Sequence, residues 1–386
     1  MTVIRTNGLS PAAQHRNEYA VVLPVMTLVA VGLLMVFSTS FAAGLAGRGL
    51  DALRPLGKHL LGLCLGAALL ALAALRPLPW LRRYAHSIFA LCFLALAAVF
   101  IPGVGHRVGY HARWISILGQ QFQPSEFAKV ALVLFLAATL SNRVQARQRG
   151  RPTSVWGPVL VACIAPLLVL LEPNFATAAV MGLAILVMLY LAGEPLRLIA
   201  VLILGAAVLF LLGLQLDPGD KWQRLAAFTG SGGLAAHAQG VGYQSIQSVR
   251  ALGAGGVVGW GLGASSAKFG ALPYSHTDFV FAVLGQETGF LGCLLVLACY
   301  VALGINCLAI AQRLRGTFPS LLIAGLALTL TLQALVNIAI AVALWVPMGV
   351  PLPFVSYGSS SLAASLAAVG LMINCARNGA SFPHNR

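Results

Sequence analysis

Charged residues are scarce in this chain of 386 residues: they make up 9% of it, and only nine are Asp or Glu. Hydrophobic residues make up 59%, and the mean hydropathy is +0.89. A soluble domain of this length needs far more charge to cover its surface. The composition therefore excludes an ordinary soluble protein and indicates that lipid covers much of the surface.

Cysteine and basic residues also lack the patterns that would indicate other protein classes. The seven cysteines all lie inside apolar segments without metal-ligand spacing, so they are expected to be small buried hydrophobes and no disulfide framework is predicted. The net charge is +15, but the basic residues are scattered through short loops between apolar runs. This distribution is typical of a membrane protein, and no nucleic-acid partner is expected.

Long apolar runs are what the sequence has in abundance. Runs near 20 residues can cross roughly 30 Å of hydrocarbon, and the polar stretch before the first run is followed by no cleavage site, which favours a retained helix. The sequence predicts an all-α integral membrane protein with about ten transmembrane helices. They are expected near residues 20–43, 57–75, 84–102, 125–141, 155–171, 175–192, 196–215, 277–308, 319–346 and 354–375, with Pro173 separating two short ones.

Basic residues in the short loops predict the orientation. Arg82, Arg83 and the arginines between 143 and 151 lie on one side, which the positive-inside rule makes cytoplasmic. Residues 1–19 and 377–386 are then cytoplasmic tails around a single polytopic domain, 20–376. The loop at 103–124 lies outside, as does the loop at about 216–276 between the seventh and eighth spans. Loops this long usually carry function. The longer one contains a Gly-rich stretch that favours a re-entrant or surface-lying loop.

Ionisable residues inside or beside apolar spans are costly and mark candidate sites. Glu126 and Lys129 are three residues apart and share a helical face, either as a structural ion pair or as a charged wall of a substrate cavity. Asp278 lies where the long loop re-enters the membrane, so it either caps the next helix or acts in catalysis. Glu287 is expected to bridge helices.

The predicted outer face also has basic and imidazole side chains suited to a phosphate or pyrophosphate ligand. These side chains are Arg107, Arg113, Lys221, Arg224, Arg250 and Lys268, with His106, His111, His237 and His276. No His, Cys, Asp or Glu cluster has metal-ligand spacing, so no metal-binding residues are predicted. Mg²⁺ or another divalent cation bound through substrate phosphates stays open.

Four ordered motifs together resemble the SEDS family, which contains FtsW, RodA and SpoVE. The motifs are Gln123-Pro124-Ser125-Glu126-Phe127-Ala128-Lys129, preceded by Arg113-Trp114-Ile115; Tyr243-Gln244-Ser245-Ile246-Gln247-Ser248; Leu272-Pro273 with His276-Thr277-Asp278-Phe279; and Pro351-Leu352-Pro353-Phe354-Val355-Ser356-Tyr357-Gly358. The resemblance covers nearly the whole chain, which is most similar to the FtsW branch.

The resemblance implies a peptidoglycan glycosyltransferase of the bacterial cytoplasmic membrane that polymerises lipid II and releases polyprenyl pyrophosphate. It implies that Asp278 is the essential acid. Arg113, Arg224, Lys268 and Lys129 are candidate substrate-binding cations, with Glu126 orienting Lys129 and His276 beside Asp278. The implied partners are lipid II, the growing glycan strand, a class B penicillin-binding protein and other division or elongation proteins. No organic cofactor is expected.

Several family residues differ here, which keeps two alternatives open. The usual Pro-Asp-x-Gly-Thr segment has Asn174 at its acidic position, and Tyr274 replaces the acid that commonly follows Leu-Pro. The missing outer-face acids keep open a divergent, non-catalytic partner of a penicillin-binding protein. A polytopic bundle with intramembrane charge would also suit a lipid II flippase, although the distinctive residues lie on one face only.

Overall fold

The computed structural model describes most of the chain. The described residues are 11–43, 54–108, 111–117, 120–151, 153–172, 174–216, 242–269 and 272–382. Seven of their helices are long and apolar enough to cross a membrane, and three shorter apolar helices accompany them. Each of these helices overlaps one predicted span, and the predicted fold class, an all-helical membrane protein, is confirmed.

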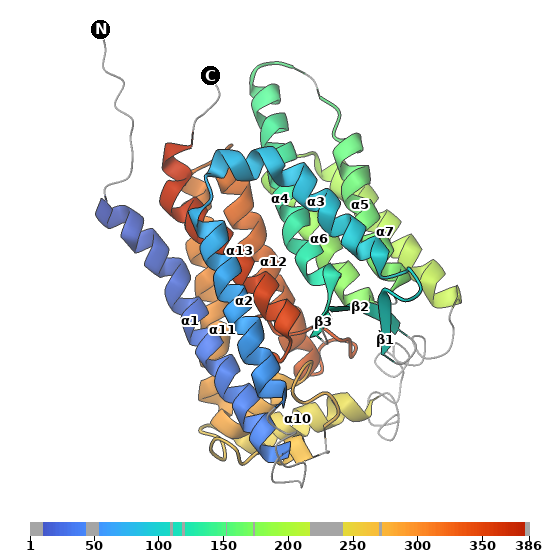
Figure 1. The fold of residues 1–386 in the computed structure, drawn as a ribbon, viewed down its shortest axis with the longest axis vertical. Helices are drawn as coiled ribbons and strands as arrows, with labels where there is room; N and C mark the ends of the chain where they lie inside the picture. Colours follow the sequence, from blue (N-terminus) through green and yellow to red (C-terminus); the bar gives the residue numbers. More distant parts are fainter. Residues whose placement is uncertain are drawn as a thin grey trace.

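The helices form an elongated bundle in which the N-terminal and C-terminal thirds of the chain lie side by side (Figure 1). The long apolar helices are α1 (Pro11–Ala43), α2 (Arg54–Leu75), α3 (Leu78–Ala98), α4 (Pro124–Gln148), α11 (Val280–Arg313), α12 (Phe318–Ala341) and α13 (Ser359–Asn378). The shorter ones are α5 (Trp156–Leu171), α6 (Phe175–Leu191) and α7 (Leu196–Leu216). The predicted break between 155–171 and 175–192 is present, although Pro173 itself lies outside the described residues.

The two predicted outer loops contain regular structure that the sequence analysis did not anticipate. Residues 103–124 contain an antiparallel sheet of β1 (Gly105–Val108), β2 (His111–Ile117) and β3 (Gln120–Phe122), in that order. The longer loop contains helix α10 (Tyr243–Gly255) and the 3-10 turn η3 (Ser266–Phe269), while 217–241 lie outside the described residues. The sheet and α10 lie at the same end of the bundle (Figure 1).

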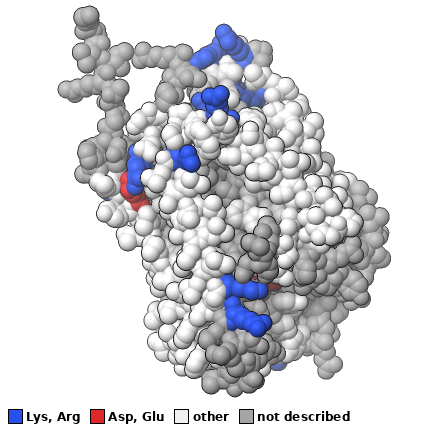
Figure 2. All heavy atoms as spheres, viewed as in Figure 1, with Lys and Arg blue, Asp and Glu red and all other residues white. Residues whose placement is uncertain are grey.

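The opposite end of the bundle carries the first turns of α1 and the last turns of α13. An ion pair of 2.7 Å joins Glu18 of α1 to Arg377 of α13 there. Lys and Arg gather towards the two ends of the visible face, with a band free of charge between them (Figure 2). This arrangement suits a membrane-spanning bundle. The side of the membrane on which each end lies, and the domain bounds, stay predictions.

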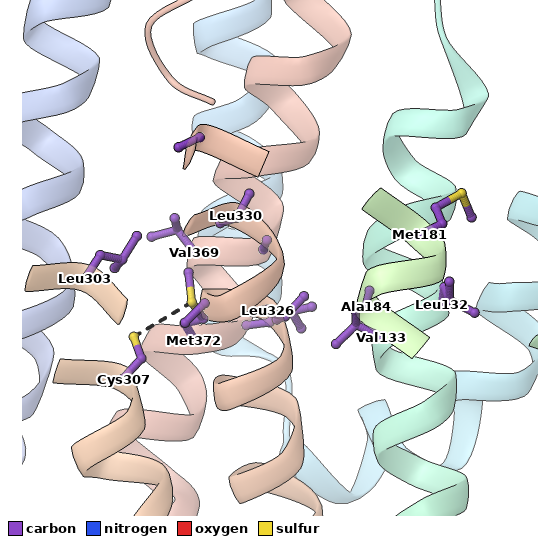
Figure 3. Packing of buried hydrophobic residues seen from close by; sticks show 14 of the residues in the cluster. Leu132, Val133, Met181, Ala184, Leu303, Cys307, Leu326, Leu330, Val369 and Met372 are labelled. Atoms are coloured by element: carbon purple, nitrogen blue, oxygen red, sulfur yellow. Dashed lines mark hydrogen bonds between the residues drawn. The ribbon is translucent and has the colours of Figure 1, made fainter. Parts of the chain in front are cut away.

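Small residues allow the helices to approach closely. A Cβ on Gly370 of α13 would lie 2.3 Å from the carbonyl oxygen of Leu70 in α2, and one on Gly62 would lie 2.6 Å from Cα of Ser359. Helix association in lipid relies on such close packing because apolar burial drives it little. A core between α4, α6, α11, α12 and α13 completes the bundle, with Cys307 Sγ 3.9 Å from Met372 Sδ (Figure 3).

Candidate active site

The predicted acid Asp278 lies in a tight turn immediately before α11. The backbone carbonyl of Tyr274 accepts hydrogen bonds from the backbone N–H groups of Thr277, Asp278 and Phe279, at 3.1, 3.1 and 3.2 Å. Tyr274 has a φ of +56°, which is rare for a bulky residue and places strain at this turn. The N-cap position of α11 is Phe279, and among the described residues no side-chain hydrogen bond caps this helix. Asp278 is therefore not its cap.

The segment before α13 holds this turn in place through backbone contacts. Ser356 Oγ donates a 2.6 Å hydrogen bond to the carbonyl of Thr277 and accepts one of 2.7 Å from the N–H of Leu352. The N–H of Tyr357 donates to the carbonyl of His276 at 3.0 Å. The His-Thr-Asp-Phe motif and the Pro-Leu-Pro-Phe-Val-Ser-Tyr-Gly motif, about eighty residues apart in the chain, therefore form one structural unit.

Two amides on α12 extend this unit towards the membrane. Asn337 donates from Nδ2 to the carbonyls of Asp278, at 2.8 Å, and Val350, at 2.6 Å. Gln333, one turn earlier, donates to the carbonyl of Pro351 at 2.9 Å. Both amides are buried, and a buried amide that bonds to loop carbonyls replaces the solvent those carbonyls would otherwise need. They therefore anchor the loops on both sides of Asp278.

The predicted pair Glu126–Lys129 is joined to this network. Lys129 Nζ lies 3.0 Å from Glu126 Oε1 and donates to Gln333 Oε1 at 2.7 Å. Both charged residues are buried, 2% and 6% exposed. They line a cavity of about 20 Å³ with Thr329 and Ser365, which has room for about one water. The structure therefore shows the ion pair, and the role of the pair as a wall of a substrate cavity stays a prediction.

Arg113, in β2, lies near enough to the Asp278 carboxyl group for its charge to act on it. Among the described residues this carboxyl makes no hydrogen bond or ion pair, and Gly349 lies against it: a Cβ there would be 3.4 Å from Oδ2. Burial raises the pKa of Asp278 to about 7, against the opposing effect of the Arg113 charge. A carboxyl group with a pKa near neutrality is suited to accept and release a proton.

Arg113 also interacts with Glu172, which follows α5. Arg113 Nε donates to the backbone carbonyl of Glu172 at 3.1 Å. The Glu172 carboxyl is buried, and neither of its oxygens has a hydrogen-bond partner among the described residues. Burial raises the pKa of Glu172 to about 8, and the Arg113 charge opposes that rise. Asn174, where the family motif has an acid, caps α6 by accepting a 3.3 Å hydrogen bond from the Thr177 N–H, a role that either side chain can fill.

The other predicted substrate-binding residues are not all beside Asp278. Lys268 is buried in an ion pair of 2.6 Å with Glu287 and donates to Ser38 Oγ at 2.8 Å. Glu287 thereby joins α11 to α1 and η3, as predicted for a bridging residue. His276 is exposed, with its ring 5.8 Å from that of Tyr357. Arg224 lies outside the described residues.

Sequence reasoning missed Gln333, Asn337, Ser356 and Glu172. Gln333 and Asn337 are four residues apart in an otherwise apolar span, a spacing that places both on one helical face and could have marked them. Glu172 is an acid between two apolar spans, which is a signal in its own right. Ser356 has no such signal, because its importance comes from the backbone groups that the fold brings to it.

Within the part of the chain that the structure describes, no three His, Cys, Asp or Glu side chains lie together as metal ligands would. Binding of Mg²⁺ or another divalent cation through substrate phosphates stays a prediction.

Comparison with known proteins agrees with the motifs. The model of the FtsW/RodA/SpoVE family, described as "Cell cycle protein", matches residues 19–380. A protein of Trichlorobacter lovleyi described as "Probable peptidoglycan glycosyltransferase FtsW" is 35% identical over 92% of this chain and 92% of its own length. One of Bacillus subtilis with the same description is 33% identical over 92% and 90%.

Solved structures show the same fold. A chain from a structure described as "Structural coordination of polymerization and crosslinking by a peptidoglycan synthase complex" has a TM-score of 0.73 and 27% identity, covering 94% of this chain and 98% of that one. The rod shape determining protein RodA of Thermus thermophilus has a TM-score of 0.65 and 27% identity, covering 93% and 96%. The family match over most of the chain and the relatives above 30% identity show that this chain belongs to the FtsW/RodA/SpoVE family.

Proposed function

We propose that this protein is a peptidoglycan glycosyltransferase that polymerises lipid II into glycan strands and releases polyprenyl pyrophosphate. Family membership and the descriptions of its FtsW relatives support the reaction. The observation that carries the proposal is Asp278: a carboxyl group without a hydrogen-bond partner among the described residues, with a pKa near neutrality, facing a cation. A residue placed only to support the fold would be expected to have its polar atoms satisfied.

In the proposed step, the 4-hydroxyl oxygen of the acceptor sugar attacks the anomeric carbon of the donor. The hydroxyl proton moves to Asp278, and the bond between the anomeric carbon and the pyrophosphate oxygen breaks with its electron pair on the leaving group. Pyrophosphate leaves without protonation, so the second carboxylate of a glycoside hydrolase is unnecessary. Inversion at that carbon gives a β-linked strand.

Cationic side chains would stabilise the departing pyrophosphate. Arg113 is the best placed of the described candidates, because it lies beside Asp278 and can form two parallel hydrogen bonds to phosphate oxygens. Lys268 and Lys129 are each committed to a buried ion pair, so direct contact with the leaving group would require a rearrangement. Arg224 stays a candidate. Mg²⁺ or another divalent cation would enter with the substrate phosphates.

The partner and the orientation belong to the same proposal. The chain is a multi-pass membrane protein, and a similar chain comes from a peptidoglycan synthase complex. We propose that a class B penicillin-binding protein is the partner, with Asp278 on the outer side of the cytoplasmic membrane and both termini in the cytoplasm. Other division or elongation proteins would join that complex.

Polymerisation with purified protein tests the proposal. The chain is purified with and without its transpeptidase, supplied with lipid II and magnesium, and assayed for glycan strands on a gel. We expect strands from the wild-type complex and a loss of at least about 100-fold for Asp278→Asn, the range that general-base catalysis contributes. Glu18→Gln, an acid-to-amide change at the other end of the bundle, is the matched control and should retain activity.

Three results would contradict the proposal. Undiminished polymer from a folded Asp278→Asn variant would remove the catalytic role of the carboxylate. A wild-type complex that makes no polymer, but moves labelled lipid II between leaflets, would identify a flippase. A complex that does neither would indicate a non-catalytic partner protein.

A further inference from the structure

A short segment after α10 carries four exposed apolar side chains within six residues. Between Ala251 and Ala267 the sequence has no charged residue. Within it, the exposed fractions are 64% for Val257, 72% for Val258, 53% for Trp260 and 60% for Leu262. Contiguous exposed apolar groups of this kind usually mark an interaction surface. We call residues 257–262 the apolar tip.

The backbone of the apolar tip is held firmly against the first turns of α11. The N–H groups of Trp260 and Gly261 donate to the carbonyls of Gln286 and Glu287, both at 3.0 Å. In return, Phe290 and Leu291 donate to the carbonyls of Gly256 and Val257, at 2.9 and 3.1 Å. These bonds are the reason that the exposed side chains project from a fixed backbone.

Glycine makes this close crossing feasible. Gly259 and Gly289 have φ angles of +79° and +69°, which L side chains rarely adopt. A Cβ on Gly259 would lie 2.2 Å from the carbonyl oxygen of Glu287, and one on Gly289 would lie 2.4 Å from the Gly259 nitrogen. The Gly-rich motif therefore serves to join two backbones, with no space left for a phosphate between them.

The surface of the apolar tip is continuous with that of a membrane-spanning helix. Phe290 and Leu291, which bond to the tip, are 62% and 55% exposed, and Leu294 and Leu295, one turn further on, are 46% and 50% exposed. They belong to α11, one of the seven helices long and apolar enough to cross a membrane. Exposed apolar residues on such a helix face lipid acyl chains.

We propose that the apolar tip inserts into the lipid leaflet at its end of the bundle, with Trp260 at the level of the headgroups. Aromatic side chains with one polar atom favour that level. Arg250, exposed on α10 just before the uncharged stretch, would reach lipid phosphates from the same side. The proposal does not rest on the glycosyltransferase reaction. In this arrangement lipid would hold the tip against the turn of α11 that contains Glu287. Through α11 the bilayer would also help to position Asp278.

Fluorescence quenching tests the proposal on the full chain in lipid nanodiscs. The other tryptophans, Trp80, Trp114, Trp156, Trp222 and Trp345, are replaced by Phe so that Trp260 alone emits. We expect emission to fall by about half in phosphatidylcholine brominated near the headgroup, because interfacial Trp contacts the upper acyl chain. Aqueous iodide should quench the emission by about a tenth or less, because a side chain at that depth is largely shielded from water. A variant that retains only Trp156, at the first residue of α5, is the control for a tryptophan at the other end of the bundle.

A second measurement covers the case in which the five-fold variant does not fold. The emission of wild-type protein minus that of Trp260→Phe gives the signal of Trp260 alone, and both quenchers are applied to that difference. Strong quenching by iodide with none by brominated lipid would overturn the proposal. So would protection from iodide that appears only when the transpeptidase is bound, because a protein would then cover the apolar tip.

Discussion

At the scale of single residues, burial and the Arg113 charge have opposite effects on the pKa of Asp278. Burial in a site of low polarity disfavours the carboxylate, while the guanidinium favours it. The result is a pKa of about 7, so near neutral pH a substantial share of the molecules would carry the carboxylate that the proposed reaction uses as a base. Two variants test this site. Arg113→Gln removes the charge near Asp278, and Asn337→Ala removes a hydrogen bond to the backbone carbonyl of Asp278.

Polymerisation should depend on pH through Asp278. In the proposed reaction the active form is the carboxylate, so the rate should fall as pH decreases through about 7. Arg113→Gln removes the charge that lowers this pKa, so the acidic limb of the profile should move to higher pH. The measurement is the rate of strand formation against pH for both proteins. A limb that moves to lower pH in Arg113→Gln would contradict the assignment.

Asn337→Ala should impair activity without touching the reacting groups. The substitution leaves the buried carbonyls of Asp278 and Val350 without their donor, at a cost of about 1–3 kcal/mol each. We expect lower kcat and a lower unfolding temperature in detergent. Asn306→Ala removes a comparable amide bond, 2.9 Å to the carbonyl of Ala20 in α1, and should retain kcat. Equal activity in the two variants would show that the Asn337 anchor is dispensable.

Close contacts between backbones govern the packing at the scale of elements. A Cβ on Gly32 of α1 would lie 2.1 Å from the carbonyl oxygen of Phe354, and Phe354 belongs to the segment that holds the Asp278 turn. We expect Gly32→Ala to lower the unfolding temperature and the rate of polymerisation together. Gly182→Ala in α6, where a Cβ meets nothing within 4 Å, should be neutral or slightly stabilising. A neutral Gly32→Ala would disprove the contact.

The buried pair Glu126–Lys129 should show strong coupling. Lys129→Met leaves the Glu126 carboxyl buried without its partner, which should destabilise the protein by about 3–5 kcal/mol. The double variant Glu126→Leu with Lys129→Met removes both charges, so much of that stability should return. Thermal unfolding in detergent of the two single variants and the double variant measures the coupling. Additive losses would mean that the two groups do not interact.

The arrangement of charge is the property of the whole molecule that predicts its orientation. The ion pair between Glu18 and Arg377 places the first helix and the last at one end of the bundle, and α4 ends there with Arg143 and Arg147 bonded to Glu194. The sheet and α10 lie at the other end (Figure 1). If the basic end is cytoplasmic, the end with the sheet and α10 lies on the opposite side of the membrane.

Reporter fusions check this orientation. A protein that fluoresces only in the cytoplasm, fused after Arg386, should be bright, and an alkaline phosphatase fused at the same position should be inactive. An insertion of the phosphatase within residues 217–241 should give the reverse result. Activity of the C-terminal phosphatase would overturn the predicted orientation and, with it, the outward position of Asp278.

The apolar periodicity was enough to predict the helices, because lipid requires each spanning segment to satisfy its own backbone bonds. The predicted spans therefore agree with helices that form largely from local sequence. The small sheet at 105–122 was not predicted, since pairing depends on which segments meet. The motif around Asp278 was recognisable in the sequence, yet its anchors Asn337 and Ser356 were not.

The sequence by itself determined membrane insertion and the positions of the spans, since both depend on the composition of each apolar segment. From its position alone Asp278 was open to capping or catalysis, and only the resemblance of its motif to the family favoured catalysis. The tertiary structure decided which charges are available. Lys268 and Asp278 are both ionisable residues near the membrane. Lys268 is buried against Glu287 and forms an ion pair with it. Asp278 lies near the Arg113 charge instead, and its pKa is about 7. Only packing creates that difference, because the free energy of a charge depends on the groups that surround it.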